Sequence, residues 1–290
     1  MHWGGTNSWA QTRVILSLFG FCAFFLAFVA NCWWLGSKSM IQSHLLKNKR
    51  IVAHLCYVFF IAGVFFPLQF TLPVQFQSVN GTSATQSGIR LIPLILGVSV
   101  LTTVTGGILT VWRHFEPFLL CGALIATAGA ASIHSLGANA STASWIGTEL
   151  ITGVGVGLAF QIPMIANQAA VGQEDIASVT ALNLFVENFG TTLFVASGEA
   201  AFTKTLMQSS ARLLPSIDPK AVLDVGATEI RNVFAGSELR EVLSSYLNGC
   251  KSGHIIPLAC GVAMSLTSMS TAGPALVKEV RMRIKKSHAG

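Results

Sequence analysis

Long apolar stretches separated by short polar connections make up most of this chain. Seven of them cover residues 14–36, 51–79, 89–112, 117–135, 145–170, 178–202 and 254–276. A helix needs about 20 apolar residues to cross a bilayer, whereas a strand of a membrane barrel needs about 10 and alternates apolar with polar side chains. The stretches are much longer than barrel strands and do not alternate. The pattern therefore predicts an all-α integral membrane protein with about seven transmembrane helices in a lipid bilayer.

Charged residues are scarce in this chain, and most lie outside the apolar stretches. They make up 10% of it, against about 25% in soluble domains. The net charge of +6 could suggest nucleic acid, but the basic residues gather beside two spans. They are Lys38, Lys47, Lys49 and Arg50 in one connection, and Lys278, Arg281, Arg283, Lys285 and Lys286 in the C-terminal tail. Basic residues in such places set membrane topology, so we expect no nucleic-acid partner.

The loops predict the orientation of the chain. The basic connection at 37–50 and the basic tail fall on one side, which the positive-inside rule assigns to the cytosol. Loops 80–87 and 136–144 fall on the other side and contain no Lys or Arg. Each of these two loops holds a glycosylation sequon, at Asn80 and Asn139. We therefore expect a multi-pass plasma-membrane glycoprotein with its N-terminus outside and its C-terminus in the cytosol.

Four segments follow from this topology. Residues 1–50 hold an extracellular N-terminus, a linking span and the basic cytosolic connection, and residues 51–203 hold five spans. Residues 204–253 form an extracellular loop, and residues 254–290 hold the last span and the tail. The loop is too short for an independent catalytic domain of ordinary size, so we expect a cap or a flexible connection.

Polar residues inside the apolar stretches are the candidates for function, because polar groups in lipid are costly and usually face a bundle interior or a cavity. Helical spacing places Gln161 and Gln168 on one face of the fifth stretch, and Asn183 and Glu187 on one face of the sixth. Gln69 lies in the second stretch. These five residues predict a pathway for substrate and protons. The alternative is that the amides hold the bundle together by interhelical hydrogen bonds.

Prolines and glycines predict kinks and close packing. Pro67 and Pro73 interrupt the second stretch, where they would act as a gate or only kink the helix. Gly153 and Gly157 form a small-xxx-small pair, and Gly190 lies on the polar face of the sixth stretch. No strand precedes this glycine run, so it predicts helix packing rather than a dinucleotide site.

The sequence lacks the motifs of an enzyme. No HExxH, P-loop lysine or GxSxG motif occurs, and the six cysteines and seven histidines are scattered without metal-ligand spacing. We expect no catalytic residue, no metal and no cofactor. A seven-span receptor would fit the topology alone, but polar residues within the spans favour a transporter.

Several ordered blocks resemble the fungal fourteen-span drug:proton antiporters of the major facilitator superfamily. Residues 78–100 contain Ser-Ala-x-x-Ser-Gly-x-x-x-x-Pro, and residues 148–190 contain Gly-x-Gly-x-Gly followed by Gln-x-Pro and Gln. FTLPVQFQ at 70–77 and the segment 216–231 also look similar to this family. The resemblance implies a C-terminal six-helix bundle with one preceding linking span.

The resemblance also implies a function. Members export small, amphipathic drugs, toxins or secondary metabolites in exchange for protons. The N-terminal signatures of the family, Gly-x-Leu-x-Asp-Arg-x-Gly-Arg and Gly-Pro-x-x-Gly-Gly, do not occur here. Alternating access needs two halves that rock about a shared site, so we expect a missing N-terminal half as a partner. The alternative is a truncated, non-transporting half or a regulatory fragment of such a transporter.

Overall fold

The computed structural model describes residues 12–35, 42–112 and 115–287, and every regular element among them is helical. The long helices are α2 (Thr12–Leu35), α4 (Lys49–Ser78), α6 (Ile92–Val111), α7 (Glu116–Ser135), α8 (Thr142–Ala159), α10 (Ile176–Leu213) and α13 (Gly236–Ser287). Short elements join them: α3 (Ser43–Lys47), α5 (Ala84–Arg90), α9 (Ile162–Ala169), the 3₁₀ turn η2 (Gln173–Asp175), α11 (Pro219–Val225) and α12 (Ile230–Val233).

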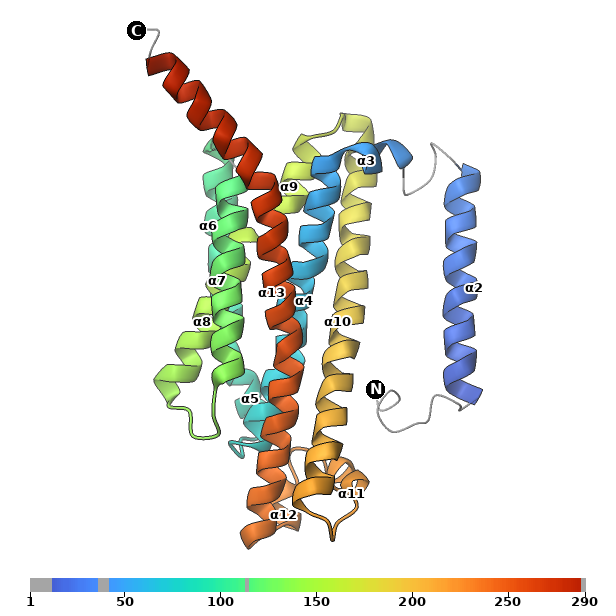
Figure 1. Cartoon of the computed structure of the whole chain (residues 1–290), viewed down its shortest axis with the longest axis vertical. Helices are drawn as coiled ribbons and strands as arrows, with labels where there is room; N and C mark the ends of the chain where they lie inside the picture. Colours follow the sequence, from blue (N-terminus) through green and yellow to red (C-terminus); the bar gives the residue numbers. More distant parts are fainter. Residues whose placement is uncertain (1–11, 36–41, 113–114, 288–290) are drawn as a thin grey trace.

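Six segments of the described chain are long and apolar enough to cross a membrane. They are Lys49–Ser78, Ala84–Val111, Glu116–Ser135, Thr142–Ala169, Gln173–Leu213 and Gly236–Ser270. These segments match six of the seven predicted stretches, and α2 covers the first stretch as a helix that stands apart from the others in Figure 1. The prediction of an all-α membrane fold is confirmed.

Two of the predicted spans are each built from two helices because of a proline. Pro93 lies in the first turn of α6, and Pro163 lies in the first turn of α9. Proline has no backbone N–H and disfavours helical geometry at the residue before it, so it suits the start of a new helix. The breaks fall at Leu91 and at Phe160–Gln161.

Helix α4 is the centre of the bundle, and α6 and α10 are its least covered members. In the most apolar window of each span, 61% of α4 is buried, against 28% for α5–α6 and 22% for η2–α10. Helix α4 packs on α10 and α13, α13 also packs on α7, and α8 packs on α6 and α7. The uncovered faces of α6 and α10 carry large apolar side chains, among them Ile95, Leu96, Val100, Leu184, Phe185 and Leu193.

The two ends of the bundle differ (Figure 1). One end carries α5, α11, α12 and the loops after α4 and α7, and we call it the cap end. The opposite end carries α3, α9 and the last residues of α13. The two sequon loops therefore lie at one end of the bundle and the basic connection before α4 leads into the other.

The segment 204–253, expected as a cap or a flexible connection, is mostly helical and packed. Helix α10 continues to Leu213, and α13 begins at Gly236, so only residues 214–235 connect the two. We call these residues the cap. Buried apolar side chains join the cap to the helix ends beneath it: Val79, Leu206, Leu214, Val222, Ile230, Phe234, Val242 and Tyr246. The Tyr246 hydroxyl donates to the Val222 carbonyl over 3.2 Å. A small apolar core of this kind holds the cap on the bundle.

Candidate functional site

Three buried polar side chains meet between α4, α9 and α10, toward the end of the bundle opposite the cap. Nδ1 of His54 lies 2.8 Å from Oδ1 of Asn167, and Nδ2 of Asn167 donates to Oδ1 of Asn183 over 3.3 Å. Asn183 in turn donates to the Val179 carbonyl over 2.8 Å. All three side chains are buried, and Nε2 of His54 makes no hydrogen bond to a described residue. The inner network, as we call His54, Asn167 and Asn183, thus retains one free site for a polar ligand or water.

Further polar contacts surround the inner network on the same end. Nε2 of Gln168 donates to the Thr180 hydroxyl over 2.8 Å and so ties α9 to α10. The His44 ring and the Asp175 carboxylate lie 2.7 Å apart and join α3 to η2. These contacts fix the short elements that close this end of the bundle.

The structure brings some of the predicted pathway residues together and separates others. Asn183 and Gln168 both lie in the α9–α10 contact. Gln161 is exposed at the break between α8 and α9. Glu187 is half-buried one turn along α10 from Asn183, and Gln69 is half-buried on α4.

His54 and Asn167 are absent from the predicted set. The prediction treated residues 145–170 as one helix with a single phase, and this placed Gln161 and Gln168 on the inner face. The break before Ile162 changes the phase, so Asn167 takes a fully buried position. The Gln-x-Pro sequence at 161–163 was the signal that could have located this break. His54 had no such signal, because a single histidine near a helix start is not distinctive.

Aromatic rings of α4 and α10 stack on one another, and two of them flank Glu187 in the sequence. The rings of Phe185 and Phe189 are stacked with centroids 6.3 Å apart, and the Phe59 ring of α4 stacks on Phe189 at 6.1 Å. No hydrogen bond or ion pair engages the Glu187 carboxylate among the described residues. Helices α4 and α10 thus carry both a cluster of rings and a carboxylate, on different faces of α10 because residues two positions apart do not share a helix face.

A second polar cluster lies near the cap end. The guanidinium carbon of Arg90 is 5.3 Å from the centroid of the Phe76 ring and 5.4 Å from that of Trp145. One turn beyond Trp145 on α8, the Glu149 side chain is fully buried.

The prolines and glycines of the predicted set lie at these helix contacts. Helix α4 runs without a break through Pro67 and Pro73. A Cβ atom on Gly157 would lie 2.6 Å from the Val98 carbonyl oxygen of α6, and one on Gly190 would lie 2.8 Å from the Phe59 carbonyl oxygen of α4. Gly153 faces the backbone of Leu94 on α6 in the same way. The backbones of these helices approach as closely as small residues permit.

Both sequon asparagines are exposed, and their loops touch. Nδ2 of Asn80 donates to the Ala138 carbonyl over 3.3 Å, so the loop after α4 lies against the loop that contains Asn139.

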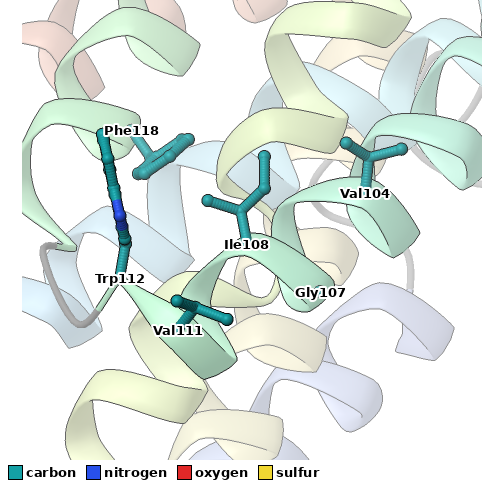
Figure 2. A pocket seen from close by; sticks show the side chains of 6 residues that line it. All are labelled: Val104, Gly107, Ile108, Val111, Trp112 and Phe118. Carbon is teal, nitrogen blue, oxygen red and sulfur yellow. The ribbon is translucent and has the colours of Figure 1, made fainter.

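The surface of α6 and α7 near the end opposite the cap carries an open apolar groove (Figure 2). Its lining residues are Val104, Gly107, Ile108, Val111, Trp112 and Phe118. None of these six lining side chains is charged, and none belongs to the inner network. The described residues also contain no group of three or more His, Cys, Asp or Glu side chains that could hold a metal ion.

Comparison with known proteins identifies the class of this helical bundle. No family model matches the chain. The dehydrocurvularin exporter of Aspergillus terreus is 32% identical over 270 residues, which cover 93% of this chain and 47% of that protein. An MFS-type transporter of Aspergillus oryzae is 31% identical over 263 residues, 90% of this chain and 47% of its own. The aspyridones efflux protein of Neocamarosporium betae is 32% identical over 291 residues, 100% of this chain and 50% of its own.

The chain therefore spans about half the length of the curated relatives it matches. These relatives are transporters and efflux pumps rather than enzymes. The chain belongs to the major facilitator superfamily, among its fungal MFS-type transporters and efflux pumps, and it looks like a C-terminal half of such a protein.

Proposed function

We propose that this chain is one half of a secondary active transporter that exports small amphipathic molecules in exchange for protons. The observation that carries the proposal is an alignment over nearly the whole chain with proteins named as exporters and efflux pumps. Transport by such proteins needs no covalent chemistry. The chain would supply one wall of the transport path.

The side chains of α4, α9 and α10 support an amphipathic substrate. The inner network offers amide and imidazole groups, and Phe59, Phe185 and Phe189 offer stacked rings on the same two long helices. A ligand with aromatic or alkyl surface and a few carbonyl or hydroxyl groups would satisfy both. Gln168 and Glu187 belong to this wall, whereas Gln69 and Gln161 would line its continuation along α4 and at the α8–α9 break.

A partner half would cover the faces that this chain leaves open. The apolar sides of α6 and α10 are the least buried in the bundle. In an alternating-access transporter, a second half rocks against the first around a site between them. An N-terminal half is therefore the partner that we propose for this chain.

We place the cap end outside the cell and the opposite end in the cytosol, within the plasma membrane. Loops 80–87 and 136–144 hold the sequons and no Lys or Arg, and basic residues gather before α4 and in the tail. The N-terminus of the chain would then be extracellular, and the C-terminus cytosolic.

Co-expression tests the transport proposal. The chain would be expressed in a yeast strain without its own drug exporters, together with the N-terminal half of the dehydrocurvularin exporter. We expect the pair to lower intracellular dehydrocurvularin or a fluorescent amphipathic dye, and to do so less when a protonophore collapses the proton gradient. Each half alone provides the control.

Two matched substitutions make the test specific. Asn183→Leu removes an amide from the inner network, and Asn188→Leu removes one that is exposed and bonds only to the Leu184 carbonyl of its own helix. At equal surface expression, Asn183→Leu should lose export and Asn188→Leu should keep it. Equal export by both variants, or accumulation that no pairing of halves changes, contradicts the proposal.

A further inference from the structure

The carboxyl group of Glu149 is the most completely buried acidic group of the described chain. The side chain has 0% exposure, and neither carboxylate oxygen makes a hydrogen bond to a described residue. An ionised carboxylate without a partner is strongly unfavourable in such a place, whereas the neutral acid is far easier to bury. The position therefore suits a group that is uncharged in this conformation and that gains a partner when it ionises.

Arg90 is poised to be that partner. Its guanidinium lies over the Trp145 ring, one helical turn from Glu149 on α8, and the two charged side chains do not form an ion pair within 4.0 Å. The guanidinium instead lies over Phe76 and Trp145, whose rings meet edge to face with centroids 5.4 Å apart. Trp145 precedes Glu149 by one helical turn on α8, so Arg90 and the two rings lie on the cap side of the carboxyl.

The guanidinium group can serve both arrangements. Its flat face stacks on aromatic rings, and its edge presents a fork of N–H donors that matches a carboxylate. The Arg90 side chain is half-exposed, so it is free to move between the rings and the carboxyl. The two arrangements compete, because one guanidinium cannot lie flat on the rings and present its edge to Glu149 at once.

The other surroundings of Glu149 carry little charge. The Leu94 backbone in the first turn of α6 lies beside the carboxyl, and first-turn amides have no acceptor within their own helix. Helix α6 has no ionisable side chain, and α4 has none between Tyr57 and Ser78. On α7, His134 points to α13, where Nδ1 lies 3.0 Å from the Lys251 carbonyl oxygen. Arg90 is therefore the charge to which Glu149 responds.

We propose that Glu149 is a proton-binding site of this transporter half and that Arg90 is its movable counter-charge. When the carboxyl is protonated, Arg90 stacks on Phe76 and Trp145. When the proton leaves to water at the cap end, the carboxylate draws the guanidinium away from the rings and forms an ion pair. The inference rests on the proposed proton-coupled function, and it locates one proton on α8, which contributes no side chain to the inner network.

Proton binding shifts the contacts of three elements at once. Arg90 ends α5, Phe76 lies in the last turn of α4, and Trp145 lies in the first turn of α8. In the protonated state the guanidinium bridges α4 and α8 through their rings, and in the ionised state it holds only α8 through Glu149. Loss of the proton therefore loosens the end of α4, which gives the proton a mechanical effect.

Infrared spectroscopy of the full chain in lipid nanodiscs tests the proton site without a transport assay. The spectrum of a protonated carboxyl group has a C=O band that disappears when the group ionises. A pH titration of the wild-type chain should show a band that Glu149→Gln removes and that Glu199→Gln, a change at an exposed acid on α10, leaves in place. The same titration with Arg90→Gln should keep the Glu149 band to a pH at least about one unit higher, because the stabilising cation is gone.

The outcomes separate this inference from the transport proposal. A titrating band that survives Glu149→Gln unchanged overturns the proton site, and a band whose titration Arg90→Gln does not move overturns the role of Arg90. Size-exclusion chromatography and circular dichroism confirm that each variant is folded, and Gln keeps the shape of Glu while remaining neutral. If the wild-type pair of halves shows no export while the Glu149 band titrates as expected, only the transport proposal is contradicted.

Discussion

Replacement of Asn167 by an apolar residue should lower the stability of the bundle, because two buried interhelical hydrogen bonds are lost. It is fully buried, and its amide serves as acceptor for His54 at 2.8 Å and as donor to Asn183 at 3.3 Å. Asn167→Leu keeps a similar volume but removes both hydrogen bonds. It leaves Nδ1 of His54 and Oδ1 of Asn183 buried without this partner.

The expected loss follows from the number of broken contacts. Interhelical hydrogen bonds in membrane proteins contribute on average about 0.6 kcal/mol each and reach about 1.7 kcal/mol. Two of them give a loss of about 1–3 kcal/mol in the free energy of unfolding. Asn188→Leu is the matched control, because it places the same side chain at an exposed position of α10 whose amide bonds only within its helix. We expect a change near zero there.

The assay is reversible unfolding of the purified chain in mixed micelles, followed by a fluorescent reporter of helix contact. A double-mutant cycle of Asn167→Leu with Asn183→Leu isolates the coupling, which should be about half of the single loss. If Asn167→Leu and Asn188→Leu have the same effect on the unfolding free energy, the inner network does not hold α4, α9 and α10 together, and the reasoning fails.

Three further predictions concern modification and transport. Asn139 should carry a glycan in more molecules than Asn80 does, because the Asn80 amide is held by the Ala138 carbonyl and lies close after the end of α4. The measurement is the change in gel mobility after glycosidase treatment of Asn139→Gln and Asn80→Gln, and equal occupancy of the two sites would contradict the prediction. The chain alone in proton-loaded vesicles should give no saturable dye flux above empty vesicles, because one wall cannot enclose a path; robust flux would refute this. In the co-expressed pair, Glu187→Gln should reduce proton-driven export while Glu199→Gln changes little, since Glu187 is half-buried and Glu199 is exposed; a pH series at matched expression that gives equal export would leave Glu187 with a packing role.

Much of the fold was predictable because the bilayer makes the apolar pattern long and distinct. Six of the predicted stretches match spans, and α2 covers the remaining one, which is the first along the chain. The prediction failed to locate the ends of α10 and α13. Residues 203–213 and 236–253 are amphipathic rather than apolar throughout, because the cap covers only one face of these helix ends, and so they fall outside the apolar stretches. Contacts with a cap that is distant in sequence decide this, and a single sequence does not reveal them.

The polar sites were harder to predict because helical phase decides them. A break of two residues at 160–161 exchanges Gln161 for Asn167 on the buried face. Glu149 lies near one end of its apolar stretch, where an acid is usually solvated, and only the packing of α6 and α7 around α8 makes it buried. Arg90 illustrates the same point, because the rings of Phe76 and Trp145 that it contacts come from two other helices.

Helix α4 links the two polar clusters and carries both prolines between them. His54 belongs to the inner network near its start, and Phe76 holds Arg90 near its end. Pro67 and Pro73 cannot donate to the carbonyls four residues earlier, at Gly63 and Gln69, so the helix lacks two of its own hydrogen bonds in this interval. Bending there costs less than elsewhere along α4. A change at Arg90 that frees the last turn can therefore move that end while the inner network holds the start in place. The prolines would then act as a hinge between the two clusters, as a gate in this helix requires.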